Sequence, residues 1–152
     1  MDGLAARAGG TARKKEMILA VDSSVMLSIL KEESSQSVWL EYLLDLGAES
    51  DLVVCDVVYA ELASFYKQPK ELNATLDALG LRFDAIQPSA AFAAGHIYLS
   101  YRKAGGPRTS LVPDFLVGAH AMHQCQGLLT TDRGYLRSHF KGLKILQPKA
   151  AS

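Results

Sequence analysis

The sequence lacks long apolar stretches. No uninterrupted apolar run among its 152 residues approaches the roughly 18 residues that a membrane-spanning helix needs. Residues 1–16 are rich in Gly and Ala and include basic side chains, but they lack the apolar core of a secretory signal. We therefore expect a mobile N-terminal extension over residues 1–16, with Met17 as a candidate natural start, and no membrane partner.

Cysteine is scarce and net charge is absent. Cys55 and Cys125 lie in apolar segments without metal-type spacing, which predicts reduced, buried thiols and favours the cytoplasm. The 16 basic and 16 acidic residues cancel, so the chain has no overall attraction to nucleic acid. A local basic rim around an acidic site stays open as an interpretation.

The chain has the size and composition of one globular domain. An apolar fraction of 49% and a charged fraction of 21% are ordinary for a folded protein, and 152 residues leave no room for a second domain. We expect the domain to span residues 17–148, followed by a short C-terminal tail over residues 149–152.

Short apolar runs alternate with helical patterns along the domain. Helices are expected from about residue 33 to 46, where Gly47 stops the helix, then after Asp56, from Pro69 to Gly80, after Ser89, and from Asp114 to Gly127. The expected strands are residues 17–21, 52–54, 81–86, 128–131 and 143–146. This order predicts an α/β fold, a three-layer α/β/α sandwich with a mainly parallel sheet of four or five strands.

Four acidic residues stand out by their positions in this pattern. Asp22 follows the first strand, Glu61 lies on the helix after the second, Asp114 opens a helix, and Asp132 follows the strand at 128–131. Ligands of open parallel sheets bind beyond the carboxyl ends of the strands, where Asp22 and Asp132 stand. Taken singly, each acid also has an ordinary interpretation as a helix cap, a solvated charge or a turn residue.

Taken together, the four acids predict a cation site. Two like charges about 4 Å apart repel by roughly 4 kcal/mol at an effective dielectric constant of 20, so a carboxylate cluster needs protons or cations. Mg²⁺ takes all-oxygen ligands and is often held by one or two carboxylates together with substrate phosphate oxygens. Such an ion activates water and stabilises charge in phosphodiester hydrolysis.

Small and polar neighbours fit a crowded acidic site. Thr130 lies two residues before Asp132 and points to the same face, so its hydroxyl is expected to hold a carboxylate or a metal-bound water. Ser24 either caps the next helix or reaches the site. Gly118 lies on the Asp114 face of its helix, and a close approach to the sheet would explain a glycine there.

Other sites built on acids or histidines fit less well. A haloacid-dehalogenase-like site requires Asp-x-Asp after the first strand, but VDSSV has Ser24 at the second acidic position. A metal-dependent adhesion site requires a serine where this chain has Met26, and a receiver domain requires paired acids after the first strand. His120 and His123 are three residues apart, point away from the Asp114 face and lack an evident third ligand, so we do not expect them to bind zinc.

The four segments ILAVDSSV, VVYAELAS, PDFLVGAHA and LLTTDRGY resemble, in this order, the acidic motifs of the PIN domain. Within that family the chain is similar to VapC-type toxins of bacterial toxin–antitoxin pairs. The resemblance covers about residues 17–148. It implies an α/β/α fold, an Mg²⁺- or Mn²⁺-dependent endoribonuclease, a homodimer, and inhibition by a VapB-like antitoxin whose tail occupies the acidic groove.

Carried over by motif, Asp22, Glu61, Asp114 and Asp132 become catalytic and metal-binding acids, supported by Ser24 and Thr130. Arg108 and Arg133 flank these motifs and are candidate contacts for RNA phosphates, or ordinary solvated charges. Two alternatives stay open: a non-catalytic PIN-fold module that binds RNA or protein, and a PIN nuclease of RNA processing that has no antitoxin.

Overall fold

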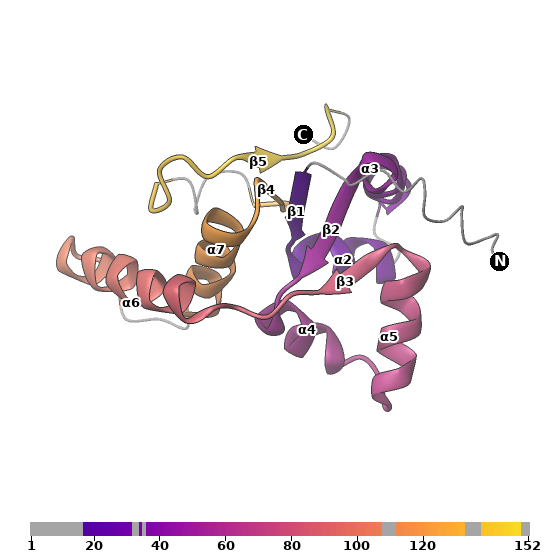
Figure 1. Ribbon diagram of the computed structural model, residues 1–152, viewed down its shortest axis with the longest axis horizontal. Helices are drawn as coiled ribbons and strands as arrows, with labels where there is room; N and C mark the ends of the chain where they lie inside the picture. The colour runs from indigo at the N-terminus through magenta and orange to yellow at the C-terminus, as the bar shows by residue number, and fades with distance from the viewer. Residues whose placement is uncertain (1–16, 32–33, 35, 108–111, 133–137, 150–152) are drawn as a thin grey trace, which may run out of the picture.

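A five-stranded sheet forms the centre of the protein. The computed structural model describes residues 17–31, 34, 36–107, 112–132 and 138–149. The sheet has the spatial order β3-β2-β1-β4-β5, and all of its pairings are parallel (Figure 1). Its strands are β1 Met17–Val21, β2 Ser50–Val54, β3 Leu81–Phe83, β4 Gly127–Leu129 and β5 Ile145–Leu146. The predicted α/β fold with a parallel sheet is confirmed.

Helices connect the strands and flank the sheet (Figure 1). The connections from β1 to β2 and from β2 to β3 run in one direction across the sheet, and the chain then returns past β1 to β4. Crossovers of the usual right hand place the helices before and after this return on opposite faces of the sheet. This connectivity builds the predicted three-layer sandwich. The helices are α2 Ser23–Leu30, α3 Gln36–Glu49, α4 Asp56–Ala63, α5 Pro69–Ala78, α6 Pro88–Lys103 and α7 Val112–Gln124.

The strand order reverses at β1. From β1 the chain moves outward to β2 and β3, and it then returns to the other side of β1 as β4 and β5. The ends of β1 and β4 are in register, with Val21 beside Leu129, and Asp22 N donates a 2.9 Å hydrogen bond to Leu129 O. The carboxyl ends of β1 and β4 therefore form the switch point at which parallel sheets bind ligands.

Two expected helix signals act differently in the structure. Gly47 was expected to end its helix, but α3 continues to Glu49. An added Cβ at Gly47 would lie 3.2 Å from Leu52 Cδ1, so this glycine serves the close packing of α3 on β2. Asp56 is the first residue of α4, and Cys55 takes the cap position.

Some element boundaries also differ from expectation. The strand expected over 81–86 ends at Phe83, and α6 starts at Pro88 with Gln87 at its N-cap, two residues before the expected cap Ser89. The expected stop at Gly80 is confirmed, because Gly80 follows α5 with a φ of 76°. Among the described residues, no helix is long and apolar enough to cross a membrane.

Candidate functional site

Asp22 stands at the switch point and caps α2. Its backbone is extended, and its Oδ1 accepts a 2.9 Å hydrogen bond from Ser23 N. The side chain thus satisfies one of the amide groups left open at the start of the helix. The capping and site interpretations of Asp22 are compatible, because the same carboxylate has a second oxygen directed elsewhere.

Two hydroxyl groups hold that second oxygen. Ser24 Oγ and the fully buried Thr130 Oγ1 each donate a 2.8 Å hydrogen bond to Asp22 Oδ2. Of the two roles considered for Thr130, the structure shows the contact with a carboxylate. Ser24 reaches the site, because the cap position belongs to Asp22. A carboxylate anchored through both oxygens has a fixed orientation, which suits a preorganised site.

Glu61 joins this cluster through Ser23. Glu61 lies exposed on α4, and its Oε1 accepts a 2.7 Å hydrogen bond from Ser23 Oγ. Ser23 therefore bridges the helix that follows β1 and the helix that follows β2. This role of Ser23 was not predicted, although a serine next to Asp22 in the motif VDSSV was a visible signal.

Asp132 is placed by the turn after β4. Asp132 N donates to Thr130 Oγ1 at 3.1 Å, and Thr131 N donates to Ser24 Oγ at 3.1 Å. Gln147, just after β5, donates its Nε2 to Thr130 O at 2.7 Å and to Asp132 O at 3.3 Å. Gln147 thus holds the turn from outside, and no feature of the sequence marked it.

Asp114 approaches the same edge from α7. The helix packs against β1, β4 and α4, and only a two-residue link separates its end from β4. A helix of 13 residues is about 20 Å long, so α7 runs back along the sheet with its first turn toward the carboxyl ends of the strands. Asp114 lies in that first turn.

The small face of α7 accommodates an aromatic ring. An added Cβ at Gly118 would lie 2.6 Å from the ring of Phe140, which is buried. The close approach expected at Gly118 is therefore made to Phe140, a residue far along the chain, and not to the sheet. Arg108 and Arg133, the candidate phosphate contacts, lie outside the described residues.

Both cysteines are free and buried, as predicted. Burial raises the pKa of Cys55, and burial followed by the nearby Asp84 carboxylate raises the pKa of Cys125 to about 12. Neither thiol has the depressed pKa of a reactive nucleophile. Covalent catalysis by cysteine is thus disfavoured.

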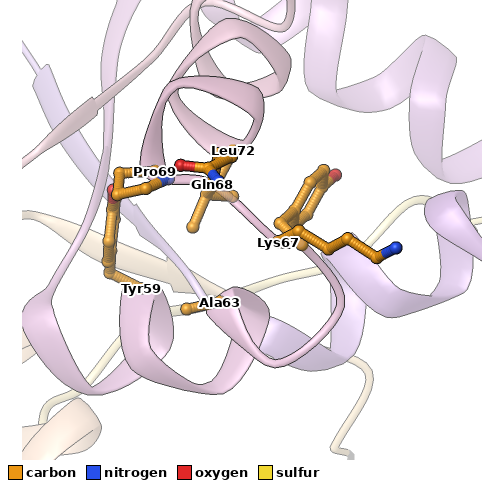
Figure 2. A pocket seen from close by; sticks show the side chains of 7 residues that line it. Tyr59, Ala63, Lys67, Gln68, Pro69 and Leu72 are labelled. Carbon is orange, nitrogen blue, oxygen red and sulfur yellow. The ribbon is translucent and has the colours of Figure 1, made fainter.

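A hollow of about 250 Å³ between α4 and α5 is separate from the acidic edge. It is lined by Tyr59, Ala63, Tyr66, Lys67, Gln68, Pro69 and Leu72. Figure 2 shows Lys67 extending away from the other labelled side chains. Both tyrosine hydroxyls already donate to α5, Tyr59 to Asn73 and Tyr66 to Thr75. This hollow is a seam between two helices and contains none of the predicted acids.

The donor chemistry at the switch point suits a hard divalent cation. Asp22, Ser24, Glu61 and Thr130 are linked through side-chain hydrogen bonds, partly by way of Ser23. The main chain of Asp132 is tied to the same cluster, and Asp114 lies in the first turn of α7, which runs toward the same edge. All of these side chains offer oxygen, which Mg²⁺ and Mn²⁺ prefer.

Comparisons with known proteins support the fold. No curated protein matches the sequence. Solved structures with similar folds include VapBC2 from Rickettsia felis bound to a DNA fragment from its promoter, with 20% identity and a TM-score of 0.62. VapBC-1 from nontypeable Haemophilus influenzae has 16% identity and a TM-score of 0.64, and DNA-bound VapBC from Salmonella typhimurium has 15% and 0.62. Each likeness covers 86% of this chain and 98% of the other.

A family model described as the PIN domain matches residues 19–141. This range includes the end of β1, the whole of β4 and all four predicted acids. Since the match covers most of the sequence, the chain belongs to the PIN-domain family of nucleases.

Proposed function

We propose that this protein is a metal-dependent endoribonuclease and the toxin of a VapBC-type toxin–antitoxin pair. The observation that carries the proposal is the hydrogen-bonded cluster at the switch point, where Thr130 and Ser24 hold Asp22, and Ser23 holds Glu61 beside it. Capping alone would not require two further hydroxyls on Asp22 or a bridge to a second acid on another helix.

The residues of the cluster have distinct roles in this proposal. Asp22 and Asp114 are the first choices as direct ligands of Mg²⁺ or Mn²⁺, and Glu61 and Asp132 complete the acidic edge. When bound, such an ion lowers the pKa of water and stabilises the charge that develops on a phosphodiester. Thr130 and Ser24 keep Asp22 oriented, and Ser23 limits the movement of Glu61.

The toxin assignment rests on the structural relatives and on how much of their chains this protein covers. The three solved structures described above are VapBC assemblies, and each of their matched chains is covered almost completely. We therefore propose a VapB-like antitoxin as the inhibitory partner, with its tail in the acidic groove, and a homodimer of this chain in the cytoplasm. Arg108 and Arg133 remain candidate contacts for RNA phosphates.

The central test is a cleavage assay on total RNA with Mg²⁺ or Mn²⁺, with EDTA, and with Asp22→Asn and Asp114→Asn. We expect cleavage by the wild type that is lost in EDTA and in both variants. Asp77→Asn, which changes an exposed acid on α5, is the matched control and should cleave normally. Cleavage that persists in EDTA or in Asp114→Asn would reject the proposed mechanism.

The same assay separates the alternatives. A non-catalytic module would bind RNA without cutting it, and a processing nuclease would cut RNA but would have no inhibitor. Co-expression with a small open reading frame adjacent to the gene tests for an antitoxin, which should suppress cleavage. RNA binding that weakens steeply with salt would support contacts with phosphates, whereas binding independent of salt would contradict them.

A further inference from the structure

A second group of ligand-type side chains lies apart from the acidic edge. Asp84 follows β3, His120 lies on α7, and Cys125 directly follows α7. Their donor atoms, a carboxylate oxygen, an imidazole nitrogen and a thiol sulfur, all lie within 4.8 Å of one another. Asp114 is six residues before His120, about 9 Å along the helix, so the two groups are separate.

The group is largely buried and only partly satisfied. His120 has no exposed surface and Cys125 is 8% exposed. His120 Nε2 is hydrogen-bonded to Asp84 Oδ2 at 2.8 Å, and Gln124 Nε2 donates to the same oxygen at 3.1 Å. Within the described part of the chain, His120 Nδ1 is buried without a hydrogen-bond partner. A fully buried imidazole with one partnerless nitrogen is unusual for a histidine with a purely structural role.

Charge around the group permits a divalent cation. The Arg82 guanidinium makes its short contact with Asp51, at 2.6 Å, and lies 3.7 Å from Asp84 Oδ1. A carboxylate and a thiolate together would neutralise a doubly charged ion, which lowers the cost of burying it. Because the shorter contact of Arg82 is with Asp51, the Asp84 carboxylate is not fully paired with Arg82.

The identity of the ligands selects the metal. Mg²⁺ and Mn²⁺ favour oxygen, whereas zinc is bound by cysteine sulfur, histidine nitrogen and carboxylate oxygen in a tetrahedron. Three protein ligands leave a fourth position for water. The sequence shows no evident third ligand near His120, but the fold supplies Asp84 from another element and Cys125 from the chain beyond the helix.

We propose that Asp84, His120 and Cys125 form a zinc site, independent of the acidic edge, that fastens the end of β3 to α7. This tie lies where the chain leaving β3 passes α7 (Figure 1). Because α7 also carries Asp114, zinc would fix the position of the helix that completes the acidic edge. The proposal does not depend on the nuclease function.

The test is a titration of the full chain, stripped with EDTA, with Co²⁺ as a spectroscopic probe in the presence of excess Mg²⁺. We expect the sulfur-to-cobalt charge-transfer band of a cysteine ligand, saturating at one equivalent and removed by added Zn²⁺. Cys125→Ser should lose the band, and Asp84→Asn should weaken binding. Circular dichroism establishes that each variant is folded.

Two controls make the outcome specific. Cys55→Ser removes the other buried thiol and should keep the band. Asp22→Asn should also keep it, which separates this site from the acidic edge. Absence of the band in the wild type, or its persistence in folded Cys125→Ser, would overturn the proposal.

Discussion

At the scale of single residues, Thr130 connects the two acids that follow β1 and β4. Its hydroxyl donates to Asp22 Oδ2 at 2.8 Å and accepts from Asp132 N at 3.1 Å. Ser24 Oγ lies 3.3 Å away and shares the same carboxylate oxygen. One buried hydroxyl thus orients the Asp22 carboxylate and the backbone that places Asp132.

Thr130→Val tests this role with little change in shape. The variant keeps the branched side chain but removes the donor to Asp22 and leaves Asp132 N without its acceptor. A hydrogen bond to a charged group contributes about 1.5–3 kcal/mol, so we expect RNA cleavage at saturating Mg²⁺ to fall by roughly 10- to 100-fold. Initial cleavage rates at several Mg²⁺ concentrations measure the effect.

Thr131→Val is the matched control for this experiment. Thr131 is the next residue and is exposed, and its contact with the site is made by its backbone N–H. We expect its cleavage rate to equal that of the wild type. Equal rates for wild type and folded Thr130→Val would mean that the hydroxyl does not orient the acids.

At the scale of helices and strands, the sequence was informative where local pattern determines position. Asp22 and Asp132 were predictable because the carboxyl ends of parallel strands meet at one edge. Gln147 was not predictable, since its contact with Thr130 depends on how a segment 17 residues away packs. Ser23 and Glu61, 38 residues apart, meet for the same kind of reason.

The predicted ends of helices and strands were wrong where tertiary packing outweighed the local sequence signals. The strand expected over 81–86 stops at Phe83, and Asp84 instead directs its carboxylate to the buried His120. Gly47, expected to end α3, lies inside the helix against Leu52. A glycine at the end of a periodic pattern looks the same in sequence whether it ends a helix or makes room for a neighbour.

Gly118 on α7 provides an element-scale prediction. Alanine favours a helix over glycine by about 1 kcal/mol, but the new Cβ would lie 2.6 Å from the buried ring of Phe140. Overpacking of this kind costs about 1–3 kcal/mol. We expect Gly118→Ala to lower the free energy of unfolding in urea, and Phe140→Leu added to it to restore part of the loss.

Gly95 on α6 supplies the control for this prediction. An added Cβ at Gly95 meets no atom within 4 Å, so Gly95→Ala has the gain in helix propensity without the clash. We expect it to stabilise the protein by up to about 1 kcal/mol. If Gly118→Ala were equally stabilising, the contact with Phe140 would not constrain α7.

At the scale of the whole molecule, apolar side chains are exposed along α6 and at the start of α7. Phe92 is 71% exposed, Leu99 lies two turns further along α6, and Val112 opens α7. An apolar hollow of about 160 Å³ between these two helices is lined by residues that include Tyr98 and Val112. Exposed apolar surface of this kind is typical of a protein contact.

We expect a second copy of this chain to cover the α6–α7 surface in the proposed homodimer. Phe92→Glu places a charge on that surface, and burying an unpaired charge is costly, so the variant should dissociate to monomers. Light scattering during size-exclusion chromatography at micromolar concentration measures the mass. Phe65→Glu is the control, because Phe65 is 53% exposed after α4 and away from this surface. A wild type that is monomeric, or Phe92→Glu that stays dimeric, would place the interface elsewhere.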